Sequence, residues 1–275
     1  MSENCSHDCA SCSQNCAERT EIQKFKPHAK SRIKHVIGVL SGKGGVGKSL
    51  VSGLLASAMA KKGFKCGVLD ADITGPSIPK IFGIKEKAEA SAEGDGILPA
   101  QAKNGVKVMS LNLLLEHEND PVIWRGALIT SAVGQFWTDV IWGDLDYLFI
   151  DMPPGTGDVT MTVFQSLPID GVIIVTSPQQ LVGMIVDKAV KMAEKMDVKV
   201  LGLVENMSYF KCPDCGKETE LFGKSRLYET AGEFNISPAV KLPLDPAVAK
   251  ACDEGRVFDV EEPALEALVN KIASR

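Results

Sequence analysis

The sequence lacks features that would place the protein in a membrane, outside the cell or on nucleic acid. No run of eighteen or more apolar residues occurs along the chain, as a membrane-spanning helix would need. The first residues are Met-Ser-Glu-Asn-Cys, without the charged lead and apolar core of a secretory signal. The net charge of -5 supplies no overall attraction to nucleic acid. We therefore expect a cytoplasmic protein with neither a membrane nor a nucleic-acid partner.

Aromatic residues are scarce, at 6%, but 45% of the 275 residues are apolar and can fill one large core. We expect a principal domain at 34–275, preceded at 1–33 by a flexible tail and linker that carries cysteines. Apolar strands alternate with helical segments along this domain, which predicts a doubly wound α/β fold with a mostly parallel sheet. The expected strands lie near 35–40, 66–70, 106–110, 146–151, 171–176, 199–205 and 239–242.

A glycine-rich loop follows the first expected strand and precedes an expected helix at 50–61. Its residues, Gly42-Lys43-Gly44-Gly45-Val46-Gly47-Lys48-Ser49, match the pattern G-x-x-x-x-G-K-[ST]. Glycines bring successive N–H groups against phosphate oxygens, Lys48 adds a positive charge, and Ser49 offers a hydroxyl to Mg²⁺. The helix N-terminus favours negative charge at the same place. The segment therefore predicts a nucleoside triphosphate site rather than a turn without a ligand.

Carboxylates stand at the ends of two further apolar strands. Asp151 ends Leu148-Phe149-Ile150-Asp151 in the manner of a metal-binding Walker B acid, and Asp70 ends the strand at 66–70. We assign Ser49 and Asp151 to magnesium, with Asp70 in support. Asp72 begins the loop that follows and is a candidate catalytic residue. The alternative, a carboxylate that only caps a helix or turn, applies to Asp158 and less to Asp72.

Eight cysteines in a protein expected in the reducing cytosol argue for metal-binding thiolates rather than disulfides. Four of them, Cys5, Cys9, Cys12 and Cys16, lie in a polar tail without an apolar core. Burial cannot explain them, and their spacing suits one face of a helix. We expect a metal or iron-sulfur site there. Zinc and iron-sulfur clusters both remain open, with His7 as a possible substitute ligand.

A second cysteine group, Cys212-Pro213-Asp214-Cys215, supplies only two ligands. A closed tetrahedral site needs two more, and no further pair follows in the sequence. A redox motif is the competing interpretation, but Pro213-Asp214 predicts a turn rather than the helix start that lowers a thiol pKa. Cys66 and Cys252 are interpreted as buried or partly buried thiols.

Together these motifs resemble the Mrp-type iron-sulfur cluster carriers, a family of ATPases in the MinD, ParA and nitrogenase reductase class. The resemblance is carried by Lys43 in the loop, by 70–79 and 151–158, and by Val204-Glu205-Asn206-Met207-Ser208-Tyr209-Phe210-Lys211-Cys212-Pro213-Asp214-Cys215, and it spans about residues 34–258. It implies a homodimeric ATPase that binds a labile cluster and transfers it to apo iron-sulfur proteins.

The resemblance also implies residue roles. Lys43 and Lys48 would be catalytic, with Lys43 reaching the partner's nucleotide, and Asp72 would orient the attacking water. Asn206 would contact the adenine, although an asparagine that merely turns the chain there explains the sequence nearly as well. Cys212 and Cys215 of both subunits would hold one [4Fe-4S] cluster at the two-fold axis.

Other functions use the same loop. A partition or positioning ATPase of the MinD or ParA type would leave the six clustered cysteines unexplained. An ATP-driven iron-sulfur electron donor resembling nitrogenase reductase is a further alternative, and a zinc-stabilised ATPase without cluster transfer is the last.

Overall fold

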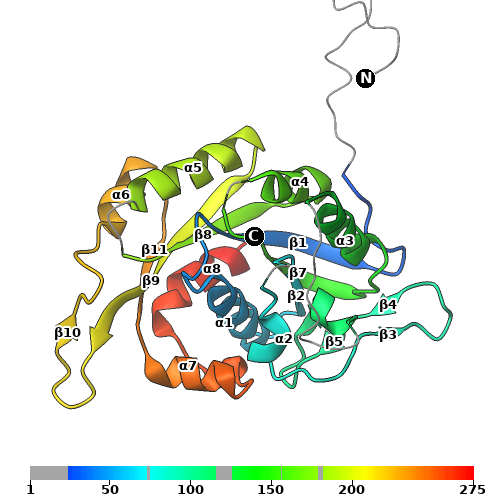
Figure 1. Ribbon diagram of the computed structural model, residues 1–275, viewed down its shortest axis with the longest axis horizontal. Coiled ribbons are helices and arrows are strands. Elements are labelled where there is room, and N and C mark those ends of the chain that lie inside the picture. The colour runs from blue at the N-terminus through cyan, green and yellow to red at the C-terminus, as the bar shows by residue number, and fades with distance from the viewer. Residues whose placement is uncertain (1–23, 73–74, 116–125, 156, 179–181) are drawn as a thin grey trace, which may run out of the picture.

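The computed structural model describes residues 24–72, 75–115, 126–155, 157–178 and 182–275 (Figure 1). These residues form a nine-stranded sheet in the order β10-β9-β8-β1-β7-β2-β6-β5, with β11 also paired to β9. The strands are β1 (Arg32–Ser41), β2 (Cys66–Asp70), β5 (Ala100–Gln101), β6 (Lys107–Met109), β7 (Asp144–Asp151), β8 (Gly171–Thr176), β9 (Lys199–Lys211), β10 (Glu218–Thr219) and β11 (Ala239–Pro243).

All pairings within this sheet are parallel except those of β5 with β6 and of β10 with β9. Every residue of β2 and of β8 is buried. Strands covered on both faces need side chains that are apolar in both directions, which explains their continuous apolar runs. The doubly wound, mostly parallel sheet predicted from the sequence is thus confirmed.

Helices cover both faces of the sheet (Figure 1). One face carries α1 and α8, whose buried side chains share a core with those of β1, β2 and β9. The other carries α3 and α4 over β7 and α5 and α6 over β8 and β9. The helices are α1 (Lys48–Lys61), α2 (Ile78–Ile81), α3 (Gly126–Thr138), α4 (Asp158–Ser166), α5 (Val182–Lys195), α6 (Leu227–Glu233), α7 (Pro246–Asp253) and α8 (Glu266–Ala273).

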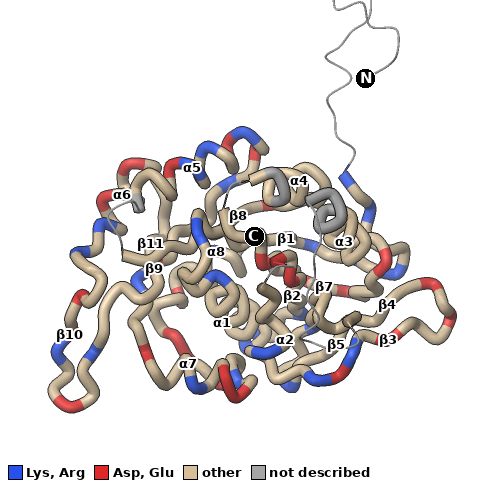
Figure 2. The backbone as a smooth tube through the Cα atoms, viewed as in Figure 1, with Lys and Arg blue, Asp and Glu red and all other residues tan. Residues whose placement is uncertain are grey.

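Charged residues line the outer helices and loops with both signs interspersed (Figure 2). In the part of the chain that the structure describes, no helix combines the length and the apolar character needed to cross a bilayer.

All seven predicted strands are present. The largest difference is β9, which continues from the predicted end at Glu205 to Lys211. Its extra length pairs with β11 on one side and with β10 beyond it. The strand at β11 was predicted, but its pairing with β9 and the short strand β10 were not. A separate antiparallel pair is formed by β3 (Glu89–Ala90) and β4 (Ile97–Leu98).

The last residues of the predicted linker lie against the domain. Phe25 N–H donates to Ser166 O, and the Trp137 indole donates to Phe25 O at 2.9 Å. Ser31 Oγ donates to Val140 O, and β1 begins at Arg32. Backbone and side-chain hydrogen bonds therefore attach the described part of the predicted linker to α3, to α4 and to Val140.

Candidate functional site

The glycine-rich loop joins β1 to α1, as the sequence predicted. Gly45 and Gly47 have φ angles of 77° and 83°, in the left-handed region that only glycine adopts without strain. Gly47 is also the residue that caps α1, so the loop N–H groups lie at a helix N-terminus. Lys43 is half-buried at the start of the loop, and Gly44 and Gly45 are exposed. This backbone can receive phosphate oxygens.

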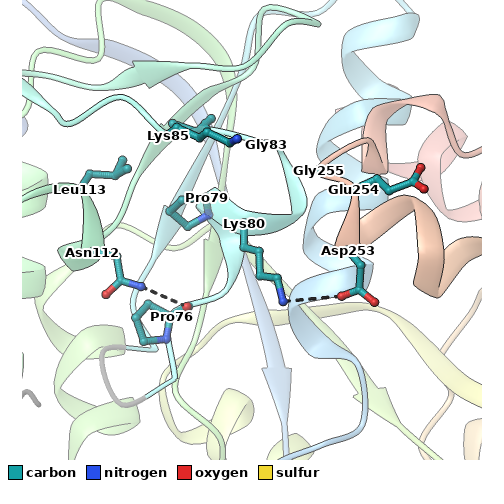
Figure 3. A pocket seen from close by; sticks show the side chains of 11 residues that line it. Pro76, Pro79, Lys80, Gly83, Lys85, Asn112, Leu113, Asp253, Glu254 and Gly255 are labelled. Carbon is teal, nitrogen blue, oxygen red and sulfur yellow. Dashed lines mark hydrogen bonds and ion pairs between the residues drawn. The ribbon is translucent and has the colours of Figure 1, made fainter. Parts of the chain in front are cut away.

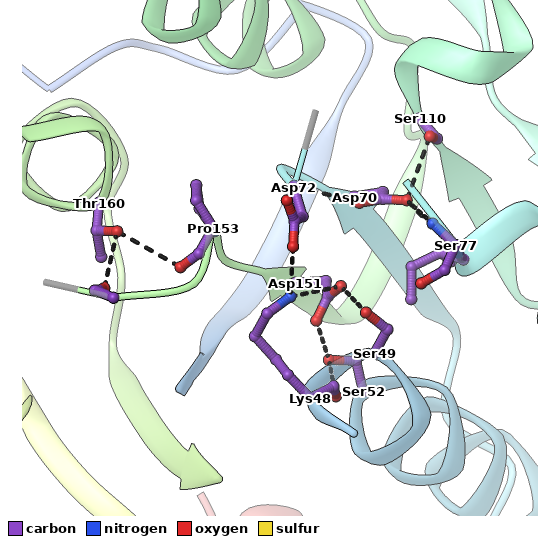
Figure 4. A network of polar contacts seen from close by, with 12 residues as sticks. Lys48, Ser49, Ser52, Asp70, Asp72, Ser77, Ser110, Asp151, Pro153 and Thr160 are labelled. Atoms are coloured by element: carbon purple, nitrogen blue, oxygen red, sulfur yellow. Dashed lines mark hydrogen bonds and ion pairs between the residues drawn. The ribbon is translucent and has the colours of Figure 1, made fainter. Parts of the chain in front are cut away.

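Asp151 is the centre of a buried polar network at the start of α1 (Figure 4). Ser49 Oγ donates to Asp151 Oδ2 at 2.6 Å, and Ser52 Oγ donates to Oδ1 at 2.8 Å. Lys48 Nζ lies 2.9 Å from Asp151 Oδ2 and 3.5 Å from Asp72 Oδ2, as ion pairs without hydrogen-bond geometry. The structure thus brings together four residues that the sequence assigned to the site, and it adds Ser52.

Sheet register places the two strand-end carboxylates beside one another. Asp70 on β2 is the register partner of Asp151 on β7, and Ala71 N–H donates to Asp151 O at 2.9 Å. Thr160 of α4 donates to Gly155 O at 3.1 Å and ties down the turn after β7. Parallel strands end at the same edge, so acids far apart in sequence meet there.

The Asp70 side chain accepts hydrogen bonds from residues outside the phosphate loop. Its Oδ2 accepts from the backbone N–H groups of Ser77 and Ile78 and from Ser110 Oγ, and its Oδ1 accepts from Asp72 N–H. Burial, and then the neighbouring Asp151 charge, raise the pKa of Asp70 to about 8. The contacts fix the beginning of α2 and the position of Asp72.

Asn206 comes from β9 and packs directly on the phosphate loop. Its Nδ2 donates to Val46 O at 3.0 Å. A Cβ added at Gly47 would lie 2.1 Å from that nitrogen, so glycine is required there by close approach as well as by φ. The sequence predicted a contact between Asn206 and the base, whereas the contact seen here is with the loop.

Cys212 and Cys215 lie in the turn that connects β9 to β10. Cys212 N–H donates to Lys217 O, and Gly216 N–H donates to Cys212 O. Cys215 is exposed. Cys212 is half-buried and lines a cavity of 370 Å³ together with Tyr209 and Pro243. Backbone N–H groups of Cys215 and Asp214 lower the pKa of Cys212 and favour its thiolate. The turn predicted at Pro213-Asp214 is confirmed.

No group of three or more metal-binding His, Cys, Asp or Glu side chains occurs within the described residues. Cys5, Cys9, Cys12, Cys16 and His7 lie outside those residues. Burial raises the pKa of Cys66 to about 12 and also raises that of Cys252, as expected for thiols that bind no metal.

A cavity of 560 Å³ lies elsewhere, between α2 and the end of α7 (Figure 3). Lys80 and Asp253 form a 3.6 Å ion pair there, and Asn112 donates to Pro76 O. None of the described residues lining it belongs to the phosphate loop or to the cysteine turn.

Sequence reasoning missed three buried polar residues, Ser52, Ser110 and Glu205. Ser52 and Ser110 donate to Asp151 and Asp70, and Glu205 precedes Asn206. Isolated serines carry no motif, so nothing in the sequence marked the first two. Glu205 had one signal, a charged residue at the end of an apolar strand.

The fold and the loop at the carboxyl ends of the strands define a P-loop NTPase. The chain belongs to the ParA family, and the matching family description is a NUBPL iron-transfer P-loop NTPase, over residues 32–275.

Curated relatives include proteins named iron-sulfur cluster carrier protein. One from Clostridium perfringens is 49% identical over 244 residues, covering 86% of each chain. Another from Methanocaldococcus jannaschii is 45% identical over 258 residues, covering 91% of this chain and 89% of the relative.

Two solved structures have folds similar to that of this chain. A nucleotide-binding protein from Archaeoglobus fulgidus in complex with ADP has 45% identity and a TM-score of 0.77, covering 85% of this chain and 91% of that one. The cell division ATPase MinD of Pyrococcus furiosus, at 20% identity with a TM-score of 0.59, covers 87% of this chain and 98% of that one and shares the fold.

Proposed function

We propose that the protein is an ATP-hydrolysing iron-sulfur cluster carrier that binds a labile cluster and transfers it to apo iron-sulfur proteins in the cytoplasm. The observation that carries the proposal is an accessible pair of thiols, one of them favoured as thiolate, on a P-loop NTPase domain. The names of relatives at 45–49% identity support the cluster as the cargo. ADP in the Archaeoglobus fulgidus structure supports an adenine nucleotide.

For the nucleotide, we assign the phosphates to the N–H groups of Gly42–Ser49 and to the Lys48 ammonium. The hydroxyl of Ser49 and the carboxylate of Asp151, 2.6 Å apart, are the hard oxygen ligands that suit Mg²⁺. When bound, Mg²⁺ would neutralise phosphate charge. Asp70 supports this site by holding the chain that carries Asp72. We assign Asp72 to the attacking water and Asn206 to the adenine.

For the cluster, two thiolates on one chain are half of a four-ligand set. A second copy related by two-fold symmetry brings the same pair, so we assign one [4Fe-4S] cluster to Cys212 and Cys215 of both subunits. Leu221, Phe222 and Tyr228, each more than half exposed, follow the cysteine turn closely. Exposed apolar side chains gathered near one turn favour a contact surface there. Lys43 is assigned to the partner's nucleotide.

The tail cysteines, Cys5, Cys9, Cys12 and Cys16, are assigned to a second metal or cluster site. Replacing all four by serine in the full chain separates their role from that of Cys212 and Cys215, because only the iron held by the tail would be lost.

Anaerobic reconstitution tests the proposal. Wild-type protein should take up iron and sulfide, show cluster absorption, and activate an apo iron-sulfur protein with loss of its own cluster. Lys43→Ala should retain nucleotide binding but lose hydrolysis. A wild-type protein that stays colourless and transfers no cluster would contradict the carrier function, and normal turnover by Lys43→Ala would contradict the role of Lys43 across the interface.

A further inference from the structure

β9 contains an irregular segment, Glu205–Ser208, between the phosphate loop and the cysteine turn. Pairing with β11 joins Glu205 to Lys241 and Tyr209 to Pro243, so β9 has more residues than β11 over the same length. A bulge of this kind redirects side chains. Here the extra residues include Asn206, which donates to Val46 O of the phosphate loop.

A left-handed residue holds the bulge in shape. Met207 has a φ of 56°, which is uncommon for a residue with a side chain. In a regular strand, residues three apart point to opposite faces. Ser208 Oγ nevertheless donates to Glu205 Oε1 at 2.5 Å. The left-handed conformation of Met207 therefore brings the two side chains together, and their hydrogen bond in turn stabilises that conformation.

Glu205 leaves this segment incompletely bonded. Its side chain is 0% exposed, and its Oε2 has no hydrogen-bond partner among the described residues. Buried carboxylate oxygens are normally satisfied, and strained backbone persists only where its surroundings hold it. The bulge thus combines an uncommon backbone conformation with a buried oxygen that lacks a hydrogen-bond partner among the described residues, a combination typical of segments that switch between two arrangements.

The bulge is connected firmly to both sites. Asn206 Nδ2 donates to Val46 O and occupies the space that a Cβ at Gly47 would need, so Asn206 lies directly on the loop backbone and can follow its movement. On the other side, Leu244 N–H donates to Tyr209 O at 2.7 Å, and Phe210 and Lys211 pair with β10. These bonds make the chain from Tyr209 to Cys212 a stiff extension of the bulge.

We propose that the Glu205–Ser208 bulge transmits the nucleotide state of the phosphate loop to Cys212, with Glu205 and Ser208 as positioning residues. Phosphate binding at the loop moves Asn206, the bulge changes its conformation, and the position of Cys212 changes with it. The inference rests on the proposed function for what the thiols carry, but the coupling itself requires only a nucleotide site and a thiol.

Alkylation of Cys212 in the metal-free, full-length protein measures the coupling without a cluster. The rate with iodoacetamide, followed by peptide mass spectrometry, is compared for protein alone, with Mg-ADP and with a non-hydrolysable Mg-ATP analogue. We expect the wild-type rate to differ about fivefold or more between states, the lower end of typical coupling. In Ser208→Ala and Glu205→Gln the ratio should fall close to one, with nucleotide affinity changed less than about threefold.

The matched control is Ser225→Ala, which removes a hydroxyl from the chain between β10 and α6 and should keep the wild-type ratio. Met207→Gly gives the same test if the polar variants do not fold, because glycine adopts the native φ but loosens the connection. A wild-type ratio of one, or an unchanged ratio in the folded bulge variants, overturns the inference. Failure of the carrier function appears separately, as absence of iron from reconstituted wild type.

Discussion

The phosphate-loop region and the cysteine turn differ in how their functional groups are held. Lys48, Asp70 and Asp151 are at most 6% exposed, and each is positioned by side chains from other elements. Cys215 is exposed, and the cysteine turn is held by local backbone hydrogen bonds, from Cys212 N–H to Lys217 O and from Gly216 N–H to Cys212 O. Both regions are anchored to the same sheet, the first at its centre and the second at its edge (Figure 1).

This difference indicates what each region takes from outside the chain. The buried network is built to hold charge in a fixed geometry, which suits phosphate and a divalent cation. The exposed turn presents two thiols and leaves room for other ligands to approach and leave, which suits the cluster proposed above as cargo. If each region binds its own ligand in this way, a variant that removes one ligand should spare binding of the other, whereas the response of Cys212 to the nucleotide state is a separate property of the bulge between them.

The largest effect is expected at the turn itself. Cys212→Ser should abolish the cluster assigned to the Cys212 and Cys215 pair, because serine is a poor iron ligand, while nucleotide affinity stays within about twofold. Iron and sulfide analysis of the reconstituted protein, in a background with the tail cysteines replaced, measures cluster loss. Titration calorimetry with nucleotide measures the affinity. Cys252→Ser is the matched control. Cluster absorption retained in Cys212→Ser would refute the ligand assignment.

At the phosphate loop, Lys48→Ala should weaken ATP binding about 100-fold, the equivalent of losing one charge-assisted contact to phosphate. It should leave iodoacetamide reactivity of Cys215 unchanged. Titration with a fluorescent ATP analogue gives the affinity. Lys191→Ala, which removes a surface lysine paired to Asp187, should bind as wild type. Wild-type affinity in Lys48→Ala would contradict the assigned phosphate site.

The free energy of unfolding of Asp70 variants tests how firmly the phosphate-loop region is held. Asp70→Ala leaves the buried N–H groups of Ser77 and Ile78 without an acceptor and should lower the free energy of unfolding by about 1–3 kcal/mol. Asp70→Asn keeps an acceptor oxygen and should cost less. Urea unfolding followed by circular dichroism, in the presence of EDTA, gives both values. Equal losses in the two variants would argue against this hydrogen-bonding role.

The raised pKa of Asp70 predicts that the stability of the protein depends on pH. Because its pKa is raised to about 8 in the folded protein and is near 3.8 when unfolded, folding favours the protonated form. The stability from that proton is complete below pH ~4 and is lost as the pH rises through about 8. Asp70→Asn should reduce this decline, and an identical decline in both proteins would place its origin elsewhere.

The smallest effect is expected at the apolar side chains beside the turn. Phe222→Ser should weaken dimerisation by about tenfold, since a half-exposed ring contributes part of its burial energy to a contact. Sedimentation velocity on the protein with ATP and cluster measures this. Leu98→Ser, an exposed apolar residue on β4, should have no effect, and a normal dimer in Phe222→Ser would move the interface away from this surface.

The central strands and the phosphate loop were predictable because their signals are local. The continuous apolar sequence of β8 predicts a buried strand, and the glycines of the loop predict backbone with positive φ. The far end of β9 was not predictable, since its length depends on pairing with β10 and β11. Nor was the contact between Asn206 and Val46, which joins residues 160 positions apart.

By itself, the sequence determined the class of fold, the phosphate loop and the presence of two separate cysteine groups, because residue type and spacing set these. Only the tertiary structure decided which groups meet. Sheet register aligns Asp70 with Asp151, burial sets the protonation of Asp70, and the Met207 bulge brings Asn206 to the loop. Register, burial and close approach are properties of the packed chain, and no local pattern specifies them.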